Sequence, residues 1–338
     1  MPLMLQTVRL RALEPPSRIW RMITRYAVVL LVGLALPAFA QPPAAAPGGP
    51  PQGPGRGGFV PIVIGPPAPV PPEVAIPRPT AADLAQVNAA VKQWIAANRS
   101  TAKPLLQKYQ SLLMLQPPRL NVAATYTQTQ QRMGPRHEAF VETAKKGDID
   151  LLFHGDSITD WWVQGDANKA MFDKYFGGMK TANFAIAGDT TQGVLWGLKH
   201  GEGQGFQPKA IMLMIGTNNS GGSNNAGTST AAEVAEGVGA VVLEMRNDFP
   251  DAKILLLAIF PRGVPGDSVR DKIADVNRII QRLDDGRHVF YLDIGANFLD
   301  ASGFFLPDTF RPDNLHPVAK GYDIWGAAVK DKLAELMK

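Results

Sequence analysis

Five short apolar runs, alternating with longer amphipathic stretches, constrain the fold of this chain more than any other feature of its sequence. The runs occupy residues 149–153, 182–187, 210–215, 254–259 and 289–292. Each is rich in Leu, Ile, Val or Phe and is bounded by Gly, Pro, Asp or Lys, which is typical of a strand buried on both faces. Apolar residues at helical spacing mark 138–146, 230–247, 269–283 and 318–336. The alternation predicts a parallel β-sheet covered by helices.

Polar segments follow three of these runs, at the sheet edge where ligands bind in such folds. Gly155-Asp156-Ser157 follows the first run, Gly188 the second, and Gly216-Thr217-Asn218 the third. A fourth segment, Asp313-Asn314-Leu315-His316, stands before the last helical stretch. Because the carboxyl ends of parallel strands meet at one edge of a sheet, we expect the four segments to lie together.

Ser157 is the candidate nucleophile of this group. Gly155 permits a tight turn after the strand, and Ser157 would begin the following helix with its hydroxyl exposed at the sheet edge. A serine needs a base to remove its proton; His316 is the candidate base, and Asp313, three residues earlier, would orient its ring. Taken alone, Ser157 or Asp156 is better explained as the N-cap of a helix.

Attack on an ester carbonyl creates an oxyanion, which needs hydrogen-bond donors held in place. The backbone N–H groups of Ser157 and Gly188 and the side-chain amide of Asn218 are the candidates, and each such donor is typically worth about 3 kcal/mol in the transition state. Taken separately, Gly188 and Asn218 are as readily explained as turn residues. Together, the four segments predict a serine esterase site.

A second Asp-x-x-His sequence, Asp285-Gly286-Arg287-His288, does not fit this site. It lies between a helical stretch and the start of a strand, which places it at the opposite edge of the sheet. We therefore expect His288, like His137 and His200, to be a surface or loop residue. His154, at the end of the first run, either lines the cleft or ends the strand.

The amino terminus is typical of an export signal. An arginine-bearing stretch that ends at Arg25 precedes the apolar run 27–36 and the small residues Ala38-Phe39-Ala40. We therefore expect a signal peptide over 1–40 that is cleaved after Ala40. A membrane anchor is the competing interpretation, but it needs about 20 apolar residues, and this run is shorter.

Composition excludes several classes of function. Five arginines against Glu14 in the first 40 residues account for the whole formal net charge of +4, so residues 41–338 are charge-neutral and do not indicate a nucleic-acid partner. The chain has no cysteine, which excludes disulfides, thiol catalysis, cysteine-based zinc sites and iron–sulfur clusters.

Two further segments precede the predicted sheet. Residues 41–80 hold 14 of the 29 prolines and 7 glycines, which predicts a semi-rigid, disordered linker. From Thr80 onward, apolar residues fall twice at helical spacing, and Pro117-Pro118 ends the pattern. We expect a helical hairpin over 81–118, followed by the catalytic domain over 119–338.

The order of the four polar segments resembles that of the SGNH hydrolases, also called GDSL-type esterases, over roughly residues 147–338. In this resemblance, the four sequence blocks after which the family is named supply Ser157, Gly188, Asn218 and His316. Within the family the chain resembles the catalytic subunits of the platelet-activating-factor acetylhydrolase type, through NFAIAGDTT at 183–191, VLWGLKHGE at 194–202, GTNN at 216–219 and PRG at 261–263. The resemblance implies a flavodoxin-like three-layer α/β/α sandwich with five parallel strands, and neither a metal nor a cofactor.

The resemblance also implies a substrate. In the acetylhydrolase type, the positions beside the catalytic residues close a small acyl pocket, and Ile158, Thr217 and Leu315 occupy those positions here. We therefore expect acetyl or another short acyl group in the acid half of the ester.

As a whole, the sequence predicts an exported carboxylic ester hydrolase, secreted or periplasmic, with a small-molecule or polysaccharide acyl ester as its partner, no nucleic acid and no stable membrane span after signal cleavage. A carbohydrate O-deacetylase is favoured, because exported enzymes of this kind often resemble deacetylases. Three tryptophans are candidates to stack on sugar rings, with burial in the core as the alternative for each: Trp161, Trp162 and Trp196. A phospholipid-type lipase and a catalytically silent sugar-binding module of the cell envelope are alternatives. A flavin or phosphate binder is disfavoured, because the chain lacks a Gly-rich phosphate loop.

Overall fold

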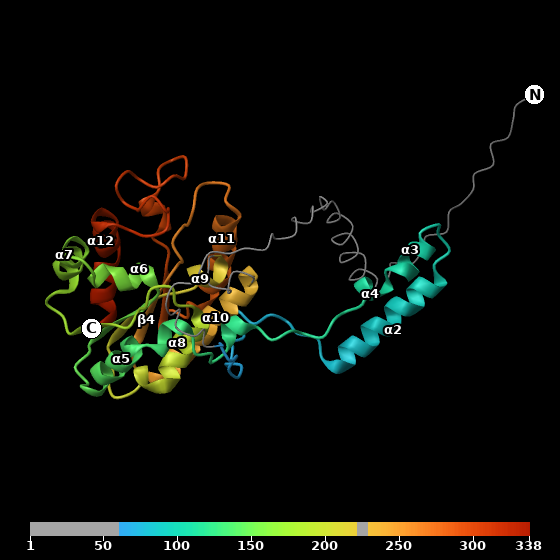
Figure 1. Ribbon diagram of the computed structural model, residues 1–338, viewed down its shortest axis with the longest axis horizontal. Coiled ribbons are helices and arrows are strands. Elements are labelled where there is room, and N and C mark those ends of the chain that lie inside the picture. The colour runs from blue at the N-terminus through green and yellow to red at the C-terminus, as the bar shows by residue number, and fades with distance from the viewer. Residues whose placement is uncertain (1–60, 222–228) are drawn as a thin grey trace, which may run out of the picture. The chain divides into compact units, whose positions relative to one another are not determined.

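The computed structural model describes residues 61–221 and 229–338 (Figure 1). The expected signal peptide and the first half of the expected linker lie outside the described residues. Five strands form an all-parallel sheet in the order β2-β1-β3-β4-β5. Their bounds are β1 Leu151–Gly155, β2 Thr181–Asn183, β3 Ala210–Met214, β4 Lys253–Leu257 and β5 Val289–Leu292. The predicted five-stranded, flavodoxin-like parallel sheet is confirmed, and in this strand order the switch point, where ligands bind, lies between β1 and β3.

Helices cover both faces of the sheet. The longer ones are α5 Pro135–Lys145, α7 Asp166–Phe176, α8 Thr191–Gly197, α10 Ala231–Asp248, α11 Ser268–Ile280 and α12 Ala319–Leu336, and the one-turn ones are α6 Ser157–Asp160 and α9 Thr217–Ser220. The 3₁₀ helices are η1 Val122–Ala124, η2 Gln130–Met133, η3 Trp161–Val163, η5 Gln281–Leu283 and η6 Gly295–Phe298, and η4 Leu198–Glu202 is a short π-helix. α5, α8, α10 and α11 enclose one core cluster, and α6, α7 and α12 enclose the other. Figure 1 shows α7 and α12 on one side of the sheet and α5 and α8 on the other.

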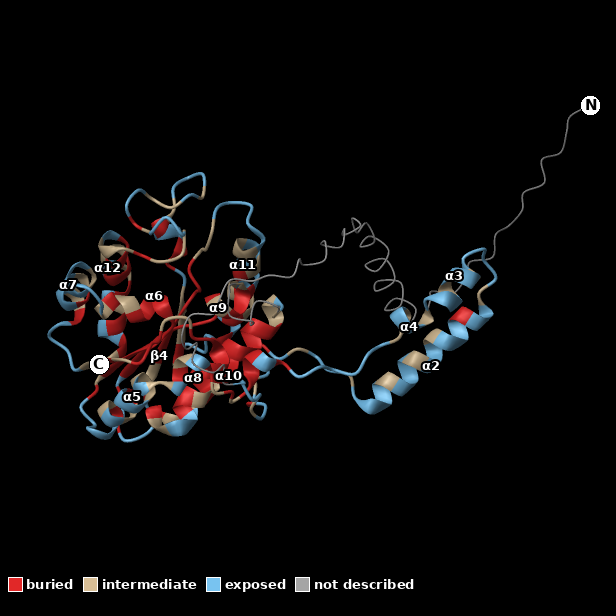
Figure 2. Cartoon of the chain, viewed as in Figure 1, coloured by how far each residue is buried: buried red, intermediate tan, exposed pale blue. Residues whose placement is uncertain are grey.

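Side chains of the central strands alternate between these two clusters. In β1, Leu152 faces the first cluster while Leu151 and Phe153 face the second, and in β3 Leu213 and Met212 divide in the same way. This period of two is what a strand buried on both faces produces, and the strands are buried along their length in Figure 2. The edge strand β5 differs from expectation, because only Val289 of its four residues is fully buried.

The second strand is shorter than its apolar run. It ends at Asn183, whose side chain accepts a hydrogen bond from the Ala185 N–H and donates to the Thr159 carbonyl. The backbone still follows β1, because the Phe184 N–H bonds the Phe153 carbonyl at 2.9 Å and the Ile186 N–H bonds the Gly155 carbonyl at 3.4 Å. Phe184 and Ile186 are also buried. The second half of the run is therefore buried and still bonded to β1, although the regular strand ends at Asn183.

Residues 65–78 differ from the expected disordered linker. The backbone of this segment pairs with the segment after the helical extension, through Ala68 N–H to Ala124 O at 2.9 Å and Tyr126 N–H to Pro66 O at 2.9 Å. Val74 is buried in the first core cluster, where a Cβ on Gly239 would lie only 2.4 Å from a Val74 methyl carbon. The linker prediction is thus wrong for this part, because proline permits extended pairing at an edge and a glycine on α10 makes room for the buried Val74 side chain.

The helical extension consists of α2 Ala81–Ala97, α3 Lys103–Lys108 and α4 Gln110–Leu113. Thr80 and Asp83 form a capping box that begins α2, and the second expected helix is interrupted at Tyr109. The side chain of Asn88 bonds the backbone of Leu115 at 2.7 and 3.0 Å, which ties α2 to the chain beyond α4. Among the described residues, none of the helices is both long and apolar enough to cross a membrane.

Candidate active site

Ser157 lies at the junction between β1 and α6. The Asp156 carboxylate accepts the Ile158 N–H at 3.1 Å and so caps α6, which leaves Ser157 as its first residue. Gly155 is required for a reason that differs from the expected tight turn: a Cβ there would lie 2.4 Å from the Met214 carbonyl oxygen on β3. The glycine therefore allows β1 and β3 to approach closely beside Ser157.

The structure joins Ser157, His316 and Asp313 by two hydrogen bonds. Ser157 Oγ lies 2.9 Å from His316 Nε2, and His316 Nδ1 lies 2.7 Å from Asp313 Oδ2. The serine is 159 residues from the histidine in sequence, so only the fold brings them together. With Asp313 accepting from Nδ1, the ring keeps Nε2 unprotonated toward the serine hydroxyl.

Asp313 is held as a carboxylate by its own loop. Burial alone would raise the pKa of Asp313, but hydrogen bonds from the His316 ring and from the backbone N–H groups of His316 and Leu315 outweigh it and lower that pKa below its ordinary value. The same Oδ1 atom accepts both backbone bonds, at 3.0 and 3.1 Å. These backbone bonds hold the Asp313 side chain independently of its hydrogen bond to the His316 ring.

The three candidate oxyanion donors follow β1, β2 and β3 at one edge of the sheet. Gly188 has φ +79°, a conformation that favours glycine. Asn218, in α9, donates one amide hydrogen from Nδ2 to the Asp189 carbonyl at 2.8 Å. A side-chain amide nitrogen carries two hydrogens, so the second is left to donate to a substrate oxygen.

The three residues expected to line an acyl pocket flank the candidate catalytic residues. Ile158 and Thr217 are each 1% exposed, and Leu315 is half-buried against the second core cluster. The Ile158 carbonyl accepts the Tyr322 hydroxyl at 2.9 Å, which ties α6 to α12. Among the described residues, the buried Thr217 hydroxyl has no hydrogen-bond partner.

The tryptophans divide between core and site. Trp162 is 0% exposed and packs among Tyr322 and Trp325 in the second cluster, so it is core. Trp161 is half-buried, and its ring centroid lies 4.1 Å from that of His316. Trp196 instead stacks on His200, with ring centroids 4.0 Å apart. Trp161 is therefore the tryptophan of the three that contacts a candidate catalytic residue.

A buried charge cluster lies beside the oxyanion segment, and sequence analysis did not find it. The Arg132 guanidinium pairs with Asp189 and Glu202, and His137 Nδ1 lies 2.7 Å from Glu202 Oε1. Burial would raise the pKa of Glu202, but the Arg132 charge, the hydrogen bond from His137 and the nearby His154 ring lower it to about 2. His154 is fully buried in β1, and burial lowers the pKa of its ring. It lies inside the strand, one residue before its end, and does not line an open cleft.

The second Asp-x-x-His sequence lies where it was expected. Asp285 accepts the backbone N–H groups of Arg287, His288 and Val289 with one oxygen, at the amino end of β5. The His288 ring nitrogen is 3.8 Å from the other Asp285 oxygen, beyond hydrogen-bond distance. This pair is a loop cap at the edge opposite Ser157.

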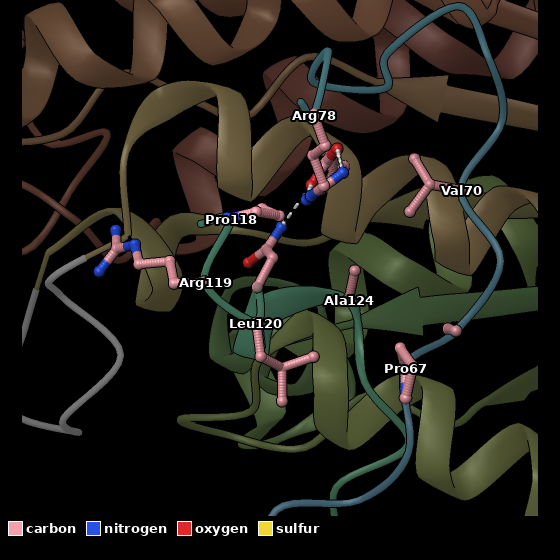
Figure 3. Close-up of a pocket in the computed structure, with 10 residues that line it drawn as sticks. Pro67, Val70, Arg78, Pro118, Arg119, Leu120 and Ala124 are labelled. Atoms are coloured by element: carbon pink, nitrogen blue, oxygen red, sulfur yellow. Dashed lines mark hydrogen bonds and ion pairs between the residues drawn. The ribbon is translucent and has the colours of Figure 1, made fainter. Parts of the chain in front are cut away.

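A cavity of about 350 Å³ lies away from this site. Its lining consists of Pro67, Ala68, Val70, Arg78, Pro118, Arg119, Leu120, Asn121, Ala124 and Glu236 (Figure 3). None of the candidate catalytic residues belongs to it. Among the residues that the structure describes, no cluster of three or more His, Asp or Glu side chains is arranged to hold a metal ion.

Comparisons with known proteins identify the family. The sequence profile of the GDSL-like Lipase/Acylhydrolase family matches residues 153–324, which are 172 of the 338 residues. Over 202 residues, 59% of this chain and 82% of the relative, the chain is 36% identical to platelet-activating factor acetylhydrolase IB subunit alpha2 of Rattus norvegicus. Over 187 residues, 55% of this chain and 75% of the relative, it is 30% identical to subunit alpha1 of Bos taurus.

A solved structure shares the fold. It is a candidate platelet activating factor from Streptococcus pneumonia, 21% identical, with a TM-score of 0.50 over 69% of this chain and 100% of that one. The profile match and the acetylhydrolase relatives confirm the predicted SGNH resemblance. The chain belongs to the GDSL-like lipase/acylhydrolase family and is an ester-hydrolysing enzyme.

Proposed function

We propose that this enzyme hydrolyses short-chain acyl esters, acetyl esters above all, with Ser157 as nucleophile, His316 as general base and Asp313 as the residue that orients the base. One observation carries the proposal: the two hydrogen bonds, of 2.9 and 2.7 Å, that link the three side chains in that order. A serine bonded to a histidine that is itself bonded to a carboxylate is the arrangement that activates a hydroxyl for acyl transfer.

The reaction proceeds in two halves. Ser157 Oγ attacks the ester carbonyl while His316 Nε2 takes the hydroxyl proton, and the resulting oxyanion accepts hydrogen bonds from Ser157 N–H, Gly188 N–H and Asn218 Nδ2. The tetrahedral intermediate collapses, and the leaving alkoxide takes the proton from His316 to depart as the alcohol. Water, deprotonated by His316, then attacks the acyl-serine, and the acid is released with the serine regenerated.

Two observations support a short acyl group. The relatives named above are acetylhydrolases by name. The two residues beside the nucleophile and the amide donor, Ile158 and Thr217, are almost fully buried, so the acyl side of the site adjoins the protein interior. With Leu315 beside His316, they would close the acid side of the site.

For the alcohol half we propose an acetylated carbohydrate. Trp161 presents a half-buried aromatic ring beside His316, and aromatic rings are common contact surfaces for sugars. A phospholipid-type ester is the alternative that the names of the acetylhydrolase relatives favour.

We also propose export to the periplasm or the medium through the signal over 1–40. The sequence read by amino-terminal sequencing of the protein recovered from those fractions should begin at Gln41.

Acetate release from acetylated polysaccharides, small acetylated sugars and short-chain acetyl phospholipids tests the proposal, with Ser157→Ala as the matched control. We expect release by the wild type from the sugar esters and loss of it in the variant. Full activity in Ser157→Ala would show that the mechanism is wrong. Release from the phospholipids alone would reject the carbohydrate half, and no release from any ester would favour a silent binding module.

A further inference from the structure

Arg132 is a buried charged residue that lies outside the family-matched region of the chain. It belongs to η2, and the match begins at residue 153. Its side chain is 0% exposed, with Nε bonded to Asp189 Oδ2 at 2.7 Å, Nη1 bonded to both oxygens of Glu202, and Nη2 bonded to the Phe184 carbonyl at 3.3 Å. A buried guanidinium is costly unless paired in this way, so its partners indicate what it holds.

One of those partners, Asp189, contacts two of the candidate oxyanion donors. Asp189 follows Gly188 directly, and the Asp189 carbonyl accepts the Asn218 amide at 2.8 Å. The other oxygen of the Asp189 carboxylate accepts the Thr129 hydroxyl at 3.1 Å and the Thr190 N–H at 2.9 Å. A single residue, clamped by Arg132, is thus adjacent to one donor in sequence and bonded to the other through space.

We propose that Arg132 is a positioning residue of the oxyanion hole: by fixing the Asp189 carboxylate, it holds the Gly188 N–H and the Asn218 amide in the orientation that an oxyanion requires. This inference rests on the proposed function of Ser157. Donors stabilise a transition state only when they are oriented before the charge develops. Gly188, at φ +79°, could adopt other backbone conformations because it is a glycine, and the Arg132–Asp189 pair restricts this freedom.

Glu202 completes the clamp on the far side of the guanidinium. His137 Nδ1 holds one Glu202 oxygen at 2.7 Å, and the side chain of Glu202 is fully buried. A Cβ on Gly197 would lie 2.6 Å from a Glu202 oxygen, so α8 leaves space for this carboxylate. Arg132 is therefore held between two buried carboxylates, and one of them, that of Asp189, belongs to the residue that follows Gly188.

The test compares Arg132→Lys with Arg78→Lys on a nitrophenyl acetate substrate. Lysine keeps the charge but loses the planar fork that bonds two carboxylates at once. Arg78 is the matched control, because it also pairs with a buried carboxylate, Glu236, at 2.6 Å, yet lies at the cavity of Figure 3. We expect Arg132→Lys to lower kcat 10- to 100-fold with KM within twofold of wild type, and Arg78→Lys to change neither by more than twofold. An unchanged kcat in folded Arg132→Lys would overturn the proposal.

A double-mutant cycle separates positioning from a general loss of stability. Residues that act through one another show non-additive effects, whereas independent residues add. We expect Asn218→Ala to lower kcat about 100-fold in the wild-type background but less than 10-fold in the Arg132→Lys background, and the full 100-fold in the Arg78→Lys background. Additive effects of Arg132→Lys and Asn218→Ala would overturn the proposal.

Two further measurements distinguish a failure of this proposal from a folding defect and from a failure of the proposed function. Should Arg132→Lys fail to fold, Thr129→Val removes one bond to the same carboxylate and no charge; a fall in kcat of threefold or more at constant KM supports positioning, and an unchanged kcat rejects it. Should the wild type hydrolyse no ester, the proposed function fails, and amide hydrogen exchange still decides the structural part. Faster exchange over 188–191 in Arg132→Lys than in Arg78→Lys supports the clamp, and equal exchange rejects it.

Discussion

The indole ring of Trp161 lies against the imidazole ring of His316, with centroids 4.1 Å apart and ring planes 31° from parallel. The Arg311 guanidinium lies 4.4 Å from the centroid of the same indole. Trp161 follows α6, which begins with Ser157, whereas His316 precedes α12. The contact therefore joins the segment that carries the proposed nucleophile to the loop that carries the proposed base, and we expect it to restrain the histidine ring independently of Asp313.

Trp161→Ala should lower kcat roughly 2- to 10-fold, because an aromatic pair of this kind is worth about 0.5–1.5 kcal/mol and the imidazolium formed in the transition state faces the indole. Trp161→Phe should retain most of the activity. Steady-state kinetics on nitrophenyl acetate provide the measurement, and Trp94→Ala, an exposed tryptophan in α2, is the control. Equal kcat for Trp161→Ala and wild type would mean that the contact does not restrain the base.

The fold and the placement of the polar segments could be predicted from the sequence, because they depend on local and periodic signals. Buried parallel strands are continuous apolar runs, and polar residues after such runs must meet at one edge of the sheet. The same signal overestimates the length of β2, which ends at Asn183, although Phe184 and Ile186 stay buried and their backbone N–H groups still bond carbonyls of β1. An apolar run reports burial, and a regular strand can end inside a buried run.

The supporting residues could not be predicted, because nothing near them in sequence indicates their partners. Arg132 stands in a polar stretch, where the ordinary expectation for an arginine is a solvated side chain. Its partner Glu202 is 70 residues away. Trp161 and Trp162 show the same limit. They are neighbours in sequence, yet Trp162 packs in the core and Trp161 contacts His316, and only the turn of η3 separates their environments.

Asn218→Ala should lower kcat about 100-fold while KM changes little, because the amide is proposed to act on charge that develops only in the transition state. Asn219→Ala is the neighbouring control: the Asn219 side chain bonds Thr191 N–H and Gln192 Oε1 inside the protein, so its loss should act mainly on stability. If Asn218→Ala raised KM and left kcat intact, the amide would be a substrate-binding group and not an oxyanion donor.

Hydrolysis of nitrophenyl esters from C2 to C10 should be fastest at C2 or nearby, because the proposed pocket of Ile158, Thr217 and Leu315 accepts a short acyl group. Leu315→Ala removes the half-buried side chain beside His316 and should move the optimum to longer esters. Leu112→Ala, exposed in α4, is the control and should leave the profile unchanged. A wild-type maximum at C8 or longer would reject the short acyl pocket.

Asp156, next to the nucleophile, should make stability fall as pH rises from about 4 to about 7. Burial raises the pKa of the Asp156 carboxyl to about 7, the charge of Asp189 adding to the effect and the hydrogen bond from Ile158 N–H opposing it. In the unfolded chain the pKa of an aspartate is about 3.9, so the folded state binds the proton more tightly. Its contribution to stability is therefore complete below pH 4 and is lost as pH rises through the folded value.

Asp156→Asn should remove this dependence while keeping the cap of α6, since asparagine is an equally good N-cap. Relative to wild type, the free energy of unfolding of the variant should rise with pH between 4 and 7, by roughly 4 kcal/mol for a shift of about three pKa units. Urea unfolding at a series of pH values provides the measurement, with the surface variant Asp173→Asn, whose side chain is 49% exposed, as the control. Parallel curves for wild type and Asp156→Asn across this range would show that the carboxyl does not titrate there, and that its buried position next to Ser157 is compatible with a charge at neutral pH.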